Sequence, residues 1–236
     1  MILFDQLSIT GRYHKFRGEE NQDVICHIQT ERYGGIIAAD GVSTCAEGKA
    51  GAALTCKTMK ERVLSNAENI FRCNCKQTTK DLLNYNLFAL DKTARASSRR
   101  VEDYASTFCM ALFDTVTKKL MVMNLGDGII LARQNGECRV LAYPSGSCDG
   151  NCWVTTTKNA EQVTRADILD AEEIDAVIIC TDGAWSLPEG AGLDPNVSAG
   201  IAGGNLEGLK HYLMSREPDD DCSFAAMLLE GNRRAE

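Results

Sequence analysis

Apolar residues recur along this chain with two different periods. Over residues 48–65 and 78–96 they return every three or four positions, which predicts two amphipathic helices. Elsewhere, short apolar runs bounded by turn residues predict strands. We expect a further helix at 206–214 and strands at 2–9, 23–29, 35–39, 106–113, 119–124, 128–133, 138–142, 154–157, 176–180 and 223–229.

The order of these elements indicates the fold class. Strands come first, followed by two long helices, a run of strands, and finally a helix and a strand, so the strict alternation of a doubly wound parallel sheet is missing. An α+β fold would bury the apolar strands if two antiparallel sheets packed face to face with helices outside, as a four-layer α/β/β/α sandwich. We expect one domain over 1–236, with a core at about 7–229 and a flexible tail at 230–236.

Aspartates stand at the ends of several apolar strands. Asp40 follows GIIAA, Asp127 follows LMVMNLG, Asp182 follows AVIICT, and Asp220 and Asp221 precede SFAAMLL. One isolated Asp-Gly pair would be an ordinary turn. Strand ends in one domain converge, however, and convergent carboxylates repel one another unless a cation neutralises them.

The type of ligand indicates the type of metal. Aspartate oxygens without nearby histidine or cysteine suit hard cations such as Mg²⁺ or Mn²⁺. Glycine beside an aspartate leaves the backbone accessible, so a carbonyl oxygen can also reach a metal. Two such ions can activate a bridging water and bind a phosphoryl oxygen. The pattern therefore predicts a metal-dependent hydrolase of phosphoesters.

Charge and hydropathy exclude other classes of protein. The net charge of −8 argues against a nucleic-acid partner, since such proteins usually carry a basic surface. No apolar stretch is long enough for a membrane-spanning helix, and the first residues lack the features of a signal peptide. We therefore expect no membrane partner and a cytoplasmic location.

The eleven cysteines carry no recognisable chemistry. Cys73 and Cys75 form a C-x-C, and Cys148 and Cys152 form a C-x-x-x-C, but neither pair has the matching half of a zinc site. In the cytoplasm these thiols should stay reduced and act as small apolar residues. A cysteine or serine nucleophile is not expected either, because C-x5-R and G-x-S-x-G motifs are absent.

Taken together, the motifs resemble the protein phosphatase 2C family of metal-dependent serine/threonine phosphatases in its compact bacterial form. The resemblance extends over about residues 7–229 and implies paired antiparallel sheets flanked by helices. It also implies that the substrate is a phosphorylated protein, and that the enzyme opposes a serine/threonine kinase. The matching segments, in the family's order, are 11–14 (GRYH), 21–23 (NQD), 39–43 (ADGVS), 105–107 (AST), 124–128 (NLGDG), 181–185 (TDGAW) and 220–223 (DDCS).

The resemblance also implies metal ligands. Asp40 would bridge two Mn²⁺ or Mg²⁺ ions, and the carbonyl of Gly41 would hold the second ion. Asp182 and Asp220 would hold the first ion. Asp127 would bind a third, looser ion together with Asp182.

Three further residues have implied roles near the metals. Asp23 would sit beside the water network that surrounds the ions. Family members often use an early arginine to hold the substrate phosphate. The candidates in this chain are His14 and Arg17, and the spacing does not decide between them.

The chain departs from the family's pattern in three places. Gln22 stands where many members have glutamate, and Ser186 stands where some place an aspartate for the third metal. Residues 143–153 lack the usual Asp-His pair. Two alternatives therefore stay open: a binding module with a degraded site, and a phosphatase of small phosphoesters.

Overall fold

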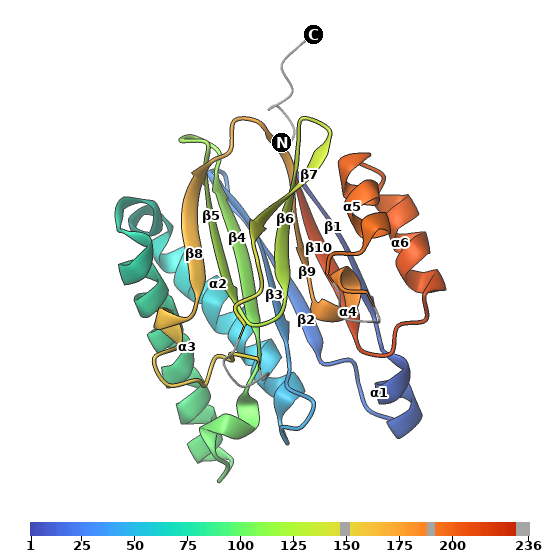
Figure 1. The fold of residues 1–236 in the computed structure, drawn as a ribbon. Coiled ribbons are helices and arrows are strands. Elements are labelled where there is room, and N and C mark those ends of the chain that lie inside the picture. Colours follow the sequence, from blue (N-terminus) through green and yellow to red (C-terminus); the bar gives the residue numbers. More distant parts are fainter. Residues whose placement is uncertain (147–151, 188–191, 230–236) are drawn as a thin grey trace.

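The computed structural model describes residues 1–146, 152–187 and 192–229, which form two five-stranded antiparallel sheets packed face to face (Figure 1). The first sheet has the order β1-β10-β9-β6-β7 and contains β1 (Ile2–Ile9), β10 (Cys222–Leu229), β9 (Ile174–Cys180), β6 (Ile129–Gln134) and β7 (Glu137–Ala142). The second has the order β2-β3-β4-β5-β8 and contains β2 (Asp23–Gln29), β3 (Tyr33–Asp40), β4 (Phe108–Asp114), β5 (Lys119–Leu125) and β8 (Arg165–Asp170).

Helices cover the outer faces of both sheets. Figure 1 shows α2 (Gly48–Arg72) and α3 (Cys75–Ala96) outside the second sheet, and α5 (Pro195–Ala202) and α6 (Leu206–Ser215) outside the first. The predicted four-layer α/β/β/α sandwich is therefore confirmed. No helix among the described residues is long and apolar enough to cross a bilayer. The remaining short helices are α1 (Arg12–Arg17), α4 (Asp182–Trp185), and the 3₁₀ turns η1 (Val101–Tyr104) and η2 (Ala160–Gln162).

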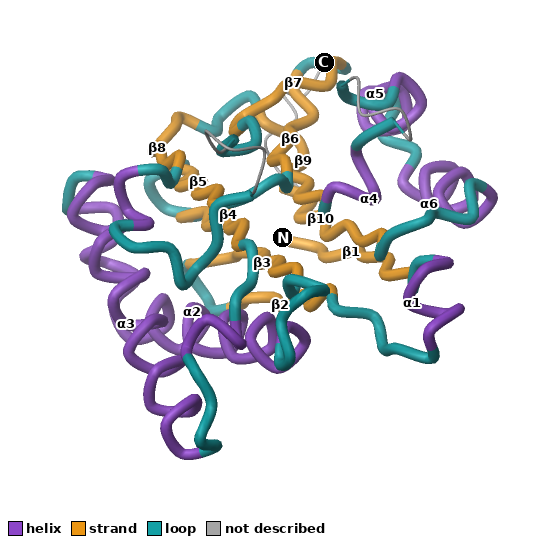
Figure 2. The backbone as a smooth tube through the Cα atoms, turned by 60° about the horizontal axis from the view of Figure 1, so that its bottom comes forward, coloured by secondary structure: helices purple, strands orange, loops and turns teal. Residues whose placement is uncertain are grey.

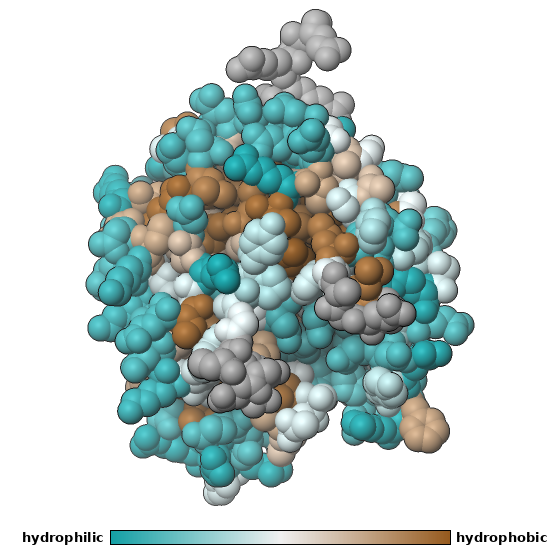
Figure 3. Space-filling view, in the orientation of Figure 1, coloured by the Kyte–Doolittle hydropathy of each residue, from teal (hydrophilic) through white to brown (hydrophobic). Residues whose placement is uncertain are grey.

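Three apolar layers hold the sandwich together. Ile36 and Ile37 on β3 are both fully buried, because successive side chains of a strand point to opposite faces. Ile36 enters the core between the sheets, and Ile37 packs under α2. On the first sheet, Phe224 lies in a third core together with Leu213 of α6. Figure 3 shows apolar residues in a band where the sheets meet, with mainly polar residues over the helices.

The predicted helices were too short. We expected the first to end at residue 65, but α2 continues to Arg72 because Ala67 and Ile70 extend its buried face. The backbone departs from helical geometry only at Asn66 (φ −140°). The second helix begins at Cys75 because the side chain of Asn74 accepts a hydrogen bond from the N–H of Gln77 (2.9 Å).

One predicted strand was wrong, and the sequence analysis missed the strand β8 and the short helices α1, α4 and α5. Residues 154–157 form a turn, in which the Thr157 hydroxyl accepts from the Val154 N–H (3.0 Å). The missed strand β8 is an edge strand of mixed polarity, and the missed helix α5 is only eight residues long. The predicted tail at 230–236 and Cys148 lie outside the described residues.

Candidate active site

The predicted site aspartates lie where strands of both sheets begin or end. β2 begins at Asp23, β3 ends at Asp40, and the antiparallel register pairs these two residues directly. In the other sheet, β9 ends just before Asp182 and β10 begins just after Asp221. Neighbouring antiparallel strands place the end of one beside the start of the next. Asp127 lies in the connection between β5 and β6, which belong to different sheets.

The electrostatic interactions among these residues show that their carboxyl groups lie close together. The pKa of the Asp40 carboxyl lies well above its ordinary value, first because the group is buried and then because other negative charges lie near it. Those charges belong, in decreasing order of effect, to Asp23, Asp182, Asp127 and Asp220. We call these five residues the aspartate cluster.

The pKa of three other members of the cluster is also raised, first by burial in each case: Asp23, Asp127 and Asp182. Burial raises the pKa of Asp182 to about 7, and the charges of Asp127 and Asp220 contribute. Burial likewise raises the pKa of Asp23 to about 7, although hydrogen bonds from Ser223 and Thr181 oppose the shift. The Thr181 hydroxyl donates to Asp23 Oδ2 at 2.9 Å. Within the cluster Asp23 is buried, Asp40, Asp127 and Asp182 are partly buried and Asp220 is exposed, and their negative charges repel one another.

The donor atoms of the cluster fit a hard divalent cation. Within residues 1–146, 152–187 and 192–229, no three His, Cys, Asp or Glu side chains lie close enough together to hold a metal ion as they stand. The cluster nevertheless offers only oxygen ligands, which Mg²⁺ and Mn²⁺ prefer. Asp23 Oδ1 and Gln22 Oε1 are buried without a hydrogen-bond partner, so both can accept from a metal-bound water. A cation would also relieve the repulsion.

Gly41 occupies a position that only glycine can fill. A Cβ atom here would lie 2.4 Å from the backbone of Gly48, at the start of α2. This close approach places α2 against the end of β3. The next residue of α2, Lys49, donates from its Nζ to the backbone carbonyl of Asp23 at 3.0 Å. The sequence analysis missed Lys49, because only the docking of α2 shows that its ammonium group reaches the site.

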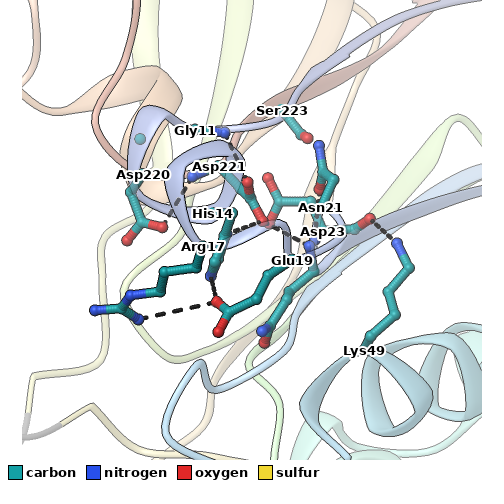
Figure 4. Close-up of polar contacts among 12 residues, drawn as sticks. Gly11, His14, Arg17, Glu19, Asn21, Asp23, Lys49, Asp220, Asp221 and Ser223 are labelled. Atoms are coloured by element: carbon teal, nitrogen blue, oxygen red, sulfur yellow. Dashed lines mark hydrogen bonds and ion pairs between the residues drawn. The ribbon is translucent and has the colours of Figure 1, made fainter.

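The two candidates for phosphate binding have different surroundings (Figure 4). His14 is only 4% exposed, and its Nδ1 lies 2.8 Å from Asp221 Oδ2, although the two are not aligned for a hydrogen bond. The side chain of Arg17 is 58% exposed, and its Nη1 lies 3.9 Å from Glu19 Oε2. Of the two, Arg17 is the cation that solvent and a substrate can reach.

Asp221 holds together the loops beside the cluster, a role that the sequence analysis did not assign. The residue is 2% exposed, and its carboxylate accepts from the N–H of Gly11 (2.8 Å) and of Gln22 (2.5 Å) (Figure 4). Because its neighbour Asp220 belongs to the cluster, Asp221 fixes the backbone at Gly11 and Gln22 beside the cluster and the start of β10. Its position in a run of three aspartates gave no signal that distinguished it.

The residues proposed for a third metal are also tied into the fold. The indole N–H of Trp185 donates to the carbonyl of Asp127 (2.8 Å), which joins α4 to the β5–β6 connection. The hydroxyl of Ser186 donates to the carbonyl of Asp182 (2.7 Å). The side chain of Ser186 is thus engaged in ending α4. Of the loop 143–153, residues 147–151 lie outside the described part.

The raised pKa values predict how pH affects the metal-free protein. A carboxyl whose pKa is about 7 when folded and about 4 when unfolded favours folding in its protonated form. The free energy of unfolding should therefore rise as pH falls from 8 to 5. We expect the Tm in EDTA to be higher at pH 5.5 than at pH 8.

The same measurement has two controls. Excess Mn²⁺ should raise the Tm most at pH 8, where the carboxylates are charged. The ion pair of Arg32 with Asp114, whose pKa is lowered to about 2, loses its stabilising effect only when the pH falls below about 4. It therefore does not contribute to a difference in Tm between pH 5.5 and pH 8. A higher Tm at pH 8 than at pH 5.5 in EDTA would contradict the proposed repulsion.

The four-layer sandwich, with aspartates that converge from both sheets, is the architecture that the sequence motifs predicted. The family model for protein phosphatase 2C matches residues 10–213. The chain therefore belongs to the protein phosphatase 2C family.

Several solved structures, among them two serine/threonine phosphatases, share the fold at low sequence identity. The serine/threonine phosphatase Stp1 from Staphylococcus aureus is 15% identical with a TM-score of 0.69, over 98% of this chain and 96% of that one. The S. agalactiae serine/threonine phosphatase is 15% identical with a TM-score of 0.70, over 98% and 100%. RsbX, crystallised in complex with magnesium, is 12% identical with a TM-score of 0.64, over 97% and 96%. No curated protein matches the chain by sequence.

Proposed function

We propose that this chain is a metal-dependent phosphatase of phosphoserine and phosphothreonine in proteins. The observation that supports the proposal best is the aspartate cluster, in which burial and the neighbouring negative charges raise the pKa of Asp40 and Asp182. Such a cluster is unfavourable for folding unless a cation binds it. Membership of the protein phosphatase 2C family supplies the reaction class. The opposing kinase and the cytoplasmic location stay predictions.

In this proposal the cluster residues divide the metal ions between them. Asp40 would bind both of two Mn²⁺ or Mg²⁺ ions, Asp182 and Asp220 would hold the first, and the carbonyl of Gly41 would hold the second. Asp127 and Asp182 would contribute to a third, looser site. When bound, the ions supply an activated water and neutralise the charge of the phosphoryl group.

Asp23 handles protons beside the metals. In the metal-free protein, burial raises the pKa of Asp23 to about 7, so its carboxyl can take up and release a proton near neutral pH. Asp23 Oδ1 is buried and unpartnered, whereas Oδ2 accepts from Thr181. One oxygen is therefore fixed, and the other is free to accept a hydrogen bond from water at the cluster.

Arg17 and His14 should respond differently to substitution. We expect Arg17→Ala to lower kcat/KM about tenfold or more with the Tm unchanged, because a charge-assisted hydrogen bond to phosphate is lost. We expect His14→Ala to lower the Tm, because the side chain is buried against Asp221. Steady-state kinetics and thermal melts of both variants separate these roles. Wild-type kcat/KM in Arg17→Ala would remove this residue from the phosphate site.

The experiment that tests the function is hydrolysis of phosphothreonine and phosphoserine peptides with Mn²⁺, with Mg²⁺ and with EDTA. We expect turnover with either ion and none in chelator. Turnover in EDTA would contradict the metal mechanism. Hydrolysis of p-nitrophenyl phosphate without hydrolysis of any peptide would favour the small-phosphoester alternative. No hydrolysis of either with saturating Mn²⁺ would favour a binding module.

A further inference from the structure

Helix α1 exposes its aromatic side chains instead of burying them. Phe16 is 91% exposed and Tyr13 is 60% exposed, whereas His14 is the buried residue of the helix. Residues three apart lie on the same side of a helix, so the two rings form one apolar surface. Large exposed aromatic side chains are typical anchors of interaction sites.

The backbone holds this aromatic surface rigidly beside the aspartate cluster. The N–H groups of Arg12 and Tyr13 donate to the carbonyls of Pro218 (2.9 Å) and Asp219 (3.0 Å), immediately before Asp220. A Cβ at Gly11 would lie 2.3 Å from the backbone of Asp220, so the helix can approach this closely only with glycine there. Figures 1 and 2 show α1 beside the first sheet, at the end of the molecule near α4.

The far end of α1 is equally well defined. The chain turns at Gly18, whose φ of +68° lies in the left-handed region that favours glycine. The N–H of Glu19 then donates back to the carbonyl of His14 (2.9 Å). Since both ends are fixed, a partner that packs on α1 does not have to order it first.

The charge of α1 is opposite to that of the molecule as a whole. The helix carries Arg12, Lys15 and Arg17 and no acidic residue, whereas the chain has a net charge of −8. Arg12 is paired with Asp219, but Lys15 has no ion pair among the described residues. Lys15 therefore offers a free cation next to an exposed apolar surface.

We propose that α1 is a docking surface for the segment of a protein substrate that flanks the phosphorylated residue. An apolar side chain of that segment packs against Tyr13 and Phe16, and a neighbouring acidic side chain pairs with Lys15. The inference rests on the proposed phosphatase function and specifies the substrate's sequence context. Two observations favour this partner. The positive charge of α1 complements an acidic segment, and α1 lies next to Asp220 of the aspartate cluster.

The test uses two fluorescein-labelled nonapeptides with a central phosphothreonine. One carries leucine two residues and glutamate four residues to each side, and the other carries alanine at those positions. Fluorescence anisotropy in EDTA measures binding without metal-dependent turnover, and hydrolysis with Mn²⁺ is measured separately. The proteins are wild type, the double variant Tyr13→Ala/Phe16→Ala, and Phe88→Ala as the matched control, because Phe88 is a 70% exposed aromatic residue on α3.

We expect the wild type and Phe88→Ala to bind the leucine–glutamate peptide about tenfold more tightly than the alanine peptide. The double variant should lose that preference and keep its rate on p-nitrophenyl phosphate. Lys15→Glu should weaken binding of the same peptide, and replacing the peptide's glutamates by lysines should restore it.

Three outcomes overturn the docking proposal: equal affinity of the wild type for both peptides, an unchanged preference in the double variant, or a parallel loss of p-nitrophenyl phosphate hydrolysis in the double variant. Absence of hydrolysis of every substrate, with the binding preference intact, would count against the phosphatase function and leave α1 as a docking surface.

Discussion

Replacing Asp40 or Asp182 by asparagine is expected to abolish turnover while the chain stays folded. In the proposed function each of these carboxylates would be a metal ligand, and metal ions contribute several kcal/mol of charge stabilisation in the transition state. At about 1.4 kcal/mol per tenfold change, kcat should fall by roughly a thousandfold. Steady-state assays with a phosphothreonine peptide and Mn²⁺ measure this loss.

The same variants should be more stable than the wild type when metal is absent. An amide removes one of the negative charges that raise the pKa of Asp40 or Asp182, so the repulsion within the cluster falls. We expect the Tm in EDTA at pH 8 to rise by a few degrees. Asp170→Asn is the control, because this exposed residue of β8 forms an ion pair with Lys119 and does not belong to the aspartate cluster. A wild-type rate in Asp40→Asn or Asp182→Asn would refute the assignment of that residue.

Replacing Asp221 by alanine should destabilise the protein more than any substitution within the aspartate cluster. The change leaves the buried N–H groups of Gly11 and Gln22 without an acceptor and removes the contact with His14. Breaking a buried, hydrogen-bonded charged group lowers the free energy of unfolding by about 3–5 kcal/mol. In a protein of this size that corresponds to a Tm lower by roughly 10 °C.

Two further variants show whether the charge or the hydrogen bonds matter at Asp221. Asparagine keeps one acceptor oxygen, so Asp221→Asn should lose less stability than Asp221→Ala. Asp219→Ala removes the neighbouring carboxylate, whose ion pair with Arg12 is exposed, and should change the Tm little. If Asp219→Ala and Asp221→Ala had equal effects on the Tm, Asp221 would not be the residue that holds the loops.

The fold class and most strands could be predicted because buried strands carry long apolar runs. The segment GIIAA before Asp40 predicted β3, since both faces of that strand are covered. The edge strand β8 alternates polar and apolar residues too weakly to stand out. The end of α2 was missed because its last turns keep only Ala67 and Ile70 as buried apolar residues.

The sequence predicted that the aspartates lie close together, but it did not predict the residues that hold the surrounding backbone in place. Asp40, Asp127 and Asp182 could be found because each follows an apolar strand directly. Lys49 and Asp221 act through backbone groups that are distant in the sequence, so no local pattern reveals them. The contrast between His14 and Arg17 likewise depends on burial, which spacing alone does not give.

The most direct test of the central claim is calorimetric titration of Mn²⁺ into the metal-free protein at pH 7.5. If the aspartate cluster is the metal centre, the wild type and Asp170→Asn should bind Mn²⁺ saturably, and Asp40→Asn should lose most of the binding because Asp40 bridges the ions. Binding of Mn²⁺ to Asp40→Asn with the same affinity and number of ions as the wild type would contradict the claim.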